Sequence, residues 1–219
     1  MPGSMGSIRV SRLILLPAVI TLAVTILRLV GELQHWPSVY FNPGNGGRGA
    51  IVGIVWLPLI FGPYFALKLT AAGEGPSSAV KAIGFAAGGW IAMMVGAGIA
   101  FLSKATWPKI LLGVGLMAMG TLIQLVPWKA LAKTLLAYAY AARIPVLIIT
   151  YFAMQGRWGT HYDVEYTGGA GFWTQYLELG VIPQLIFWVA YTVLAGALLG
   201  GIAAALTRRG RRAAQPAPS

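Results

Sequence analysis

The chain has 219 residues, of which 58% are hydrophobic and only 10% are charged. A soluble globular domain carries roughly a quarter charged residues, so this composition excludes an ordinary water-soluble protein. Lysine and arginine number 16 against 5 acidic residues, for a net charge of +11, but they lie near the ends of apolar runs and in the C-terminal tail. We therefore expect no nucleic-acid partner. Cysteine is absent, which excludes disulfides, thiol chemistry and iron–sulfur clusters.

Successive apolar runs predict an all-α fold, a polytopic integral membrane helix bundle of about six transmembrane helices. Each crossing needs about 20 apolar residues. In chain order, the expected spans are 10–30, 50–69, 79–102, 107–126, 130–154 and the last part of 172–206. These spans leave no room for a large extramembrane domain. We expect one transmembrane domain over residues 1–206 and a basic, disordered cytoplasmic tail over residues 207–219.

Prolines predict interruptions in two of these runs. Pro58 and Pro63 lie in the second run, and each removes a backbone hydrogen bond, so a kinked or broken helix is expected there. The last run, 172–206, is too long for one simple span. Pro183 is expected to divide it into an interfacial segment and a true span.

The positive charges predict the orientation in the membrane. Outside the spans, ten lysine and arginine residues fall on the side of the N-terminus: Arg9, Arg12, Lys68, Lys81, Lys129, Lys133, Arg208, Arg209, Arg211 and Arg212. Four fall on the other side: Arg48, Lys104, Lys109 and Arg157. The excess predicts that both termini lie in the cytoplasm. We expect a multi-pass protein of a bacterial inner (plasma) membrane, with the lipid bilayer and anionic lipid at the cytoplasmic face as partners.

Two patterns bear on symmetry and assembly. Segments 58–67 and 145–154 resemble each other and lie on the second and fifth spans. An inverted 3+3 repeat of the kind common in secondary transporters would explain this, and so would chance similarity between apolar helices. Gly84 and Gly88, and likewise Gly196 and Gly200, are spaced four residues apart. Such pairs favour close helix packing, within the chain or in a homo-oligomer.

Four charged residues near membrane depth are candidate substrate-binding residues: Arg143, Glu178, Arg28 and Glu32. Arg143 lies near the middle of the fifth span, where an unpaired charge costs roughly 3 kcal/mol. We expect it to reach Glu178 or Glu32, or to line a water-filled cavity. Its planar fork of donors suits an anion, although a structural ion pair is the alternative. Arg28 and Glu32 are four residues apart, as in a local ion pair.

Both histidines and most acidic residues lie on the expected outer side. His35, His161, Asp163 and Glu165 could there contribute imidazole and carboxylate ligands to a divalent metal. Neither the spacing nor the sequence around them is a metal signature, and solvated loops are the alternative. No other cofactor is expected.

No nucleotide-binding, hydrolase or metalloprotease motif is found. The leading hypothesis is a small-solute transporter or channel-like protein with an outward-facing polar cavity. Its basis is the interrupted second span, the mid-membrane arginine and the similar segments. The alternatives are a membrane-embedded enzyme acting at the outer face on a lipid-linked substrate, and a non-catalytic subunit of a membrane complex.

Overall fold

The computed structural model describes residues 9–44, 47, 49–102 and 106–213, and this part of the chain holds helices and no strand. The α-helices are α1 (Val10–Leu33), α2 (Leu57–Ala71), α3 (Ala79–Ala97), α4 (Trp107–Leu122), α5 (Lys129–Gly156), α6 (Phe172–Gln175) and α7 (Trp188–Ala213). Short π-helical or 3-10 segments extend them at Gly98–Leu102, Ile123–Leu125, Tyr176–Val181 and Pro183–Phe187.

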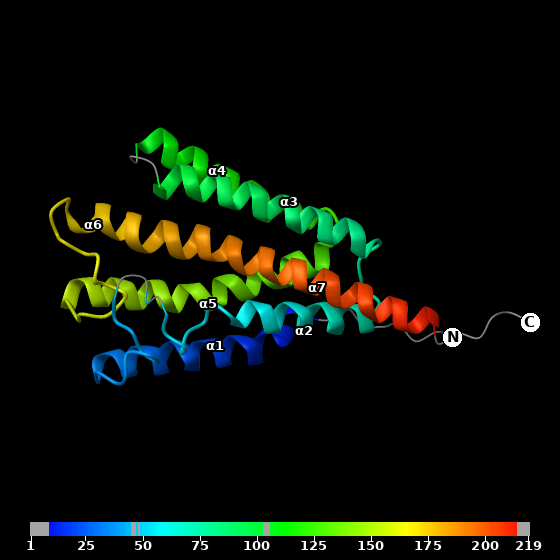
Figure 1. Cartoon of the computed structure of the whole chain (residues 1–219), viewed down its shortest axis with the longest axis horizontal. Coiled ribbons are helices and arrows are strands. Elements are labelled where there is room, and N and C mark those ends of the chain that lie inside the picture. Colours follow the sequence, from blue (N-terminus) through cyan, green and yellow to red (C-terminus); the bar gives the residue numbers. More distant parts are fainter. Residues whose placement is uncertain (1–8, 45–46, 48, 103–105, 214–219) are drawn as a thin grey trace, which may run out of the picture.

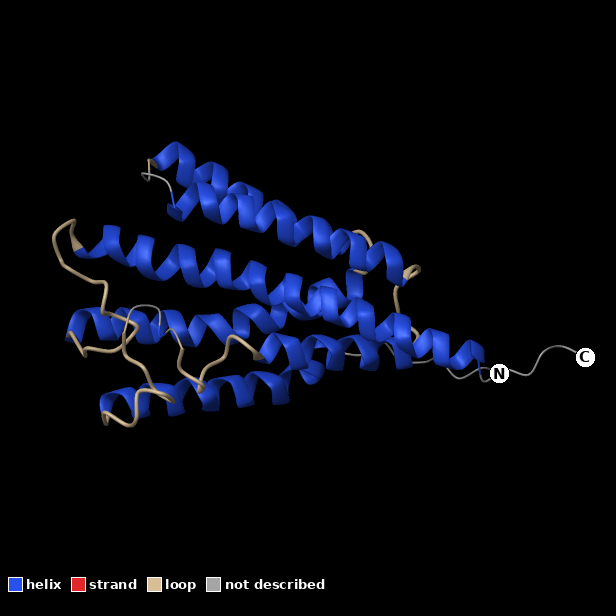
Figure 2. Ribbon diagram, viewed as in Figure 1, coloured by secondary structure: helices blue, strands red, loops and turns tan. Residues whose placement is uncertain are grey.

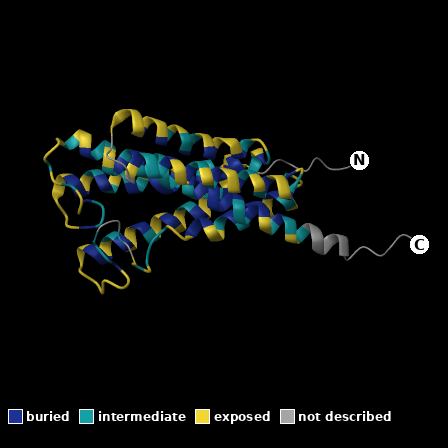
Figure 3. Ribbon diagram, turned by 45° about the horizontal axis from the view of Figure 1, so that its top comes forward, coloured by how far each residue is buried: buried dark blue, intermediate teal, exposed yellow. Residues whose placement is uncertain are grey.

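The all-α, multi-pass membrane bundle is confirmed. Five helical stretches are long and apolar enough to cross a membrane, and the shorter α2 is apolar as well. Many large apolar residues are exposed, as expected of a surface in contact with lipid, and exposed positions recur along the helices in Figure 3. The start of α1 and the end of α7 lie at the same end of the bundle (Figure 1), as an even number of crossings requires.

We call that end the termini end, and the opposite end the loop end. The loop end carries the two long irregular segments, 34–56 and 157–171 (Figure 2). These names fix positions along the bundle. The side of the membrane that each end faces is a prediction from the charge bias.

The second span differs from its predicted form. Its helix begins at Leu57 rather than near residue 50, and residues 50–56 are irregular despite their apolar composition. Pro58 stands in the first turn of α2, where its missing N–H and fixed φ are tolerated. The 15 residues of α2 span about 22 Å, less than the roughly 30 Å of a bilayer core. The helix starts well inside the bundle, and the segment before it runs from the loop end down to that point (Figure 1).

The predicted division of the last run at Pro183 is wrong. Helical backbone continues from Phe172 through Pro183 to the end of α7. Two π-helical segments, Tyr176–Val181 and Pro183–Phe187, border the proline, and such wider turns accommodate the missing N–H. At the other end, α7 includes residues 207–213 of the expected disordered tail. Residues 214–219 lie outside the described part.

Small residues set the closest helix contacts. A methyl group on Gly62 of α2 would collide with the backbone of Gly196 in α7, and one on Gly200 would lie 2.9 Å from the Ala66 side chain. The predicted packing role of Gly196 and Gly200 within the chain is therefore confirmed. A methyl group on Gly84 or Gly88 would meet nothing within 4 Å among the described residues. The predicted close packing of this pair within the chain is therefore wrong, and its part in a homo-oligomer stays a prediction.

Candidate functional site

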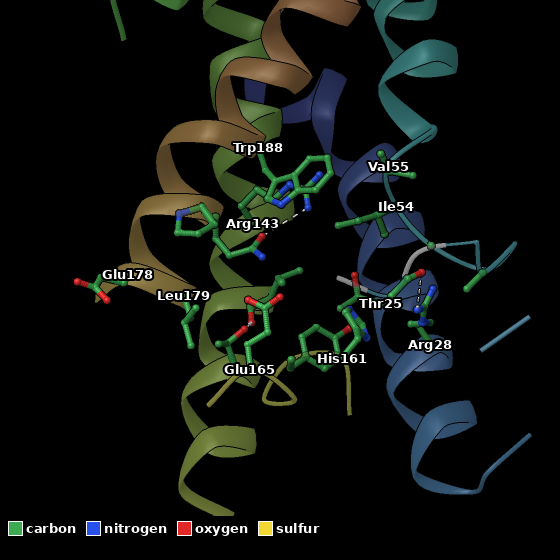
Figure 4. Close-up of a pocket in the computed structure, with 18 of the residues that line it drawn as sticks. Thr25, Arg28, Ile54, Val55, Arg143, His161, Glu165, Glu178, Leu179 and Trp188 are labelled. Atoms are coloured by element: carbon green, nitrogen blue, oxygen red, sulfur yellow. Dashed lines mark hydrogen bonds between the residues drawn. The ribbon is translucent and has the colours of Figure 1, made fainter. Parts of the chain in front are cut away.

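A cavity of about 610 Å³ opens among α1, α5, the Phe172–Phe187 stretch and residues of both long loops (Figure 4). Its volume lies in the range of small-molecule sites, roughly 300–1,000 Å³. Three of the four predicted substrate-binding residues, Arg28, Arg143 and Glu178, line it. The fourth, Glu32, is bonded to two of the lining residues, Arg28 and His161. The structure thus brings together residues from distant parts of the chain.

Toward the termini end, packed side chains lie below the cavity. Thr21 lies one turn of α1 beyond the lining residue Thr25, and its Oγ1 lies 2.8 Å from the Tyr138 hydroxyl in a buried hydrogen bond. Phe61 and Phe65 of α2 meet the Tyr138 ring edge-on, at centroid distances of 5.6 and 5.4 Å. Phe65 and Tyr138 belong to the buried core, with Phe61 packed against it, and none of these residues lines the cavity.

Arg28 holds the irregular segment before α2 in place. Its Nη1 donates to the Val52 carbonyl, and its Nη2 donates to the carbonyls of Asn42 at 2.8 Å and Gly47 at 3.3 Å. Its Nε donates to the Glu32 carboxylate. Non-helical backbone at membrane depth needs such partners, because lipid supplies none. The Nε and both Nη atoms of Arg28 therefore all have protein partners, while a role of Arg28 in solute binding stays a prediction.

Glu32 joins α1 to the 157–171 loop. Its side chain is fully buried. Besides the Arg28 contact, its Oε2 accepts the backbone N–H of His161 at 2.9 Å, and its Oε1 lies 2.6 Å from His161 Nδ1. The carboxylate thus satisfies both a buried arginine and the imidazole of a cavity-lining histidine, and it fixes the loop over the helix.

Asp163 organises the same loop from within. Its carboxylate accepts the backbone N–H groups of Gly159 at 3.0 Å and Thr160 at 2.8 Å, and the Thr160 hydroxyl at 2.7 Å. Side-chain acceptors of this kind replace backbone partners in tight turns. Asp163 therefore shapes the segment that presents His161 and Glu165 to the cavity.

The four candidate metal ligands do not converge. His161 is bonded to Glu32, Asp163 to its own turn, and Glu165 is exposed at the cavity, while His35 is exposed just beyond α1 with a φ of 52°. Among the described residues, no group of three or more histidine or acidic side chains could hold a metal ion. The metal site stays a prediction without a ligand set.

Arg143 is the most unusual group at the site. It is only 5% exposed. Its Nη1 makes one long hydrogen bond, 3.5 Å, to Gln184 Oε1, and its guanidinium lies 4.9 Å from the centre of the Trp188 ring. Its Nε is buried without a hydrogen-bond partner among the described residues. Neither Glu32 nor Glu178 forms the expected ion pair with it, and Glu178 points away from the cavity (Figure 4). Arg143 instead takes the other expected position, on a cavity.

Tyr162, Gln184 and Trp188 are among the lining residues that sequence reasoning missed. Gln184 carried a signal, because it is an amide within an apolar run. Tyr162 and Trp188 carried none beyond an aromatic ring. Burial, reinforced by the charge of Glu32, raises the pKa of the Tyr162 hydroxyl above its usual value.

Comparisons with protein-family models, with curated proteins and with solved structures find no match to this chain.

Proposed function

We propose that this protein is a multi-pass membrane transporter for a small anionic solute, with Arg143 as the solute-binding group. The observation that carries the proposal is a buried guanidinium that lines a cavity and has no carboxylate partner among the described residues. An unpaired charge at such depth is costly and marks a functional group by default. The planar fork of arginine matches a carboxylate or phosphate with two parallel hydrogen bonds.

The shape of the cavity supports transport. It lies toward the loop end, where residues of both long loops line it, and its lining does not include Thr21, Tyr138, Phe61 or Phe65. A transporter with its solute site open to one side has this arrangement, and an interrupted helix beside the site is a common feature of such proteins. The charge bias supports an orientation with the loop end outside, the termini in the cytoplasm and anionic lipid at the cytoplasmic face.

A second candidate is a membrane-embedded enzyme acting at the loop end. The Glu32–His161 pair favours it, because a carboxylate on Nδ1 orients an imidazole that lines the cavity. Histidine oriented in this way is a common general acid or base. The test below distinguishes the two candidates, since a transporter returns the solute chemically unchanged.

Uptake into liposomes tests the proposal. The purified protein would be reconstituted and offered labelled lactate, benzoate, phosphate and sulfate, and the recovered solutes would be analysed for chemical change. We expect uptake of at least one anion, and its loss in Arg143→Gln and Arg143→Lys, because lysine cannot make the paired contact. Arg157→Gln is the matched control, since Arg157 is exposed in the loop and lies outside the cavity lining. Uptake that survives Arg143→Gln would refute the proposal, and chemical conversion of a solute would favour the enzyme.

A further inference from the structure

The charges around the cavity do not cancel locally. Arg28 and Glu32 neutralise each other through a direct ion pair. That leaves Arg143 as a buried positive group without an acidic partner among the described residues. A solute held there must bring a negative group to the guanidinium.

An acidic side chain faces Arg143 from the loop. Glu165 lines the cavity, is exposed, and points into it in Figure 4. It forms no hydrogen bond or ion pair within the described residues, and it does not lie within ion-pair distance of Arg143. Glu178 also lies at the rim but points away (Figure 4). The cavity therefore has a buried positive group on one side and an available negative group on the other.

Apolar side chains form much of the remaining lining. Ile54 and Val55 line it on the side of the irregular segment, and Val146, Leu179 and Trp188 line it on the side of α5 and the last helix. Such a wall suits the hydrocarbon or aromatic body of a solute. A highly charged anion gains nothing from it and meets the repulsion of Glu165.

We infer that the solute is a zwitterion, an amino acid with an apolar side chain: its carboxylate binds Arg143, its ammonium group binds Glu165, and its side chain packs on the apolar wall. The inference rests on the proposed function and adds a second charge to the solute. An anion without an ammonium group would leave Glu165 unpaired beside it, and an amine without a carboxylate would leave Arg143 unpaired.

Binding to the full-length protein in lipid nanodiscs, measured by calorimetry, tests the inference with two matched sets of probes. One set is phenylalanine, 3-phenylpropanoate and phenethylamine, and the other is leucine, 4-methylpentanoate and 3-methylbutylamine. We expect each amino acid to bind about tenfold or more tightly than either partner that lacks one charge, as typical for a lost charged hydrogen bond. Glu165→Gln should remove most of that preference over the carboxylate partner. Glu74→Gln is the matched control, since Glu74 lies outside the cavity lining, and it should leave the preference intact.

Three results would contradict the inference. If the carboxylates bind as tightly as the amino acids, and Glu165→Gln changes neither, the solute needs no ammonium group while the anion proposal stands. If none of the six probes binds, the amino-acid class is wrong, and the uptake of inorganic and simple organic anions decides the proposed function separately. Arg143→Gln should weaken the binding of both the amino acids and the carboxylates. If the binding of both classes is unchanged in this variant, both proposals are contradicted.

Discussion

Replacing Glu32 by glutamine tests whether this residue anchors the loop end. The substitution keeps the size of the side chain and removes its charge. Glu32 accepts from Arg28 Nε and from the His161 backbone, and it contacts His161 Nδ1. Breaking a buried ion pair by removing one partner costs about 3–5 kcal/mol, because the remaining charge stays buried. At about 2–4 °C per kcal/mol for a chain of this length, Tm should fall by on the order of 10 °C.

Thermal unfolding in detergent, followed by circular dichroism, measures the effect. Arg28→Gln and the double variant complete a cycle that isolates the pair. Because the double variant has no uncompensated charge in this pair, it should lose less stability than the sum of the two single changes. Glu178→Gln is the control, since that carboxylate is exposed and points out of the cavity. A Tm within about 2 °C of wild type for Glu32→Gln, under 1 kcal/mol on the same scale, would refute the reasoning.

Three further predictions concern packing and ionisation. Gly62→Ala should destabilise the protein by about 1–3 kcal/mol in the same unfolding assay, because its methyl group meets the Gly196 backbone. Gly88→Ala has open space around the new methyl group, so it should be neutral or stabilise by up to about 1 kcal/mol, and a loss would point to a contact with a second copy. The pKa of Tyr162 is raised by burial. Stability should therefore fall as pH rises through about 10, because the exposed phenol of the unfolded chain ionises there. In Tyr162→Phe, Tm should fall less steeply with pH. Equal slopes of Tm against pH in the two proteins would contradict this prediction.

The class of fold was predictable because it depends on composition and run length. Lipid admits helices or closed barrels, and successive apolar runs of about 20 residues leave only helices. The start of α2 was not predictable in the same way. Residues 50–56 are as apolar as a helix, but the Val52 carbonyl accepts from Arg28, 24 residues earlier, and the N–H groups of Ile51 and Val52 bond to backbone carbonyls of the preceding loop. Apolar periodicity does not show such contacts.

At the loop end, local contacts were easier to predict from the sequence than contacts between distant segments. Asp163 binds groups three and four residues before it, a spacing that a turn can satisfy by itself. Glu32 binds His161 across 129 residues, and the pairing depends on α1 and α5 lying side by side. The sequence supplied both residues as candidates on the same side of the membrane. It did not indicate that they meet each other rather than a metal ion.

For Arg143, the sequence predicted the depth in the membrane but not the groups that contact the guanidinium. Its position in the fifth span required some compensation for the charge, and a cavity was one of the two expected forms. The predicted ion pair between Arg143 and Glu178 does not form, because Glu178 is exposed on the last helical stretch. The groups that meet Arg143 instead are Gln184 and Trp188, one and five residues after Pro183 along a helix that was expected to break there. Continuity through Pro183 thus brings a neutral amide and an aromatic face, rather than a carboxylate, to the guanidinium, and its charge stays available for a solute.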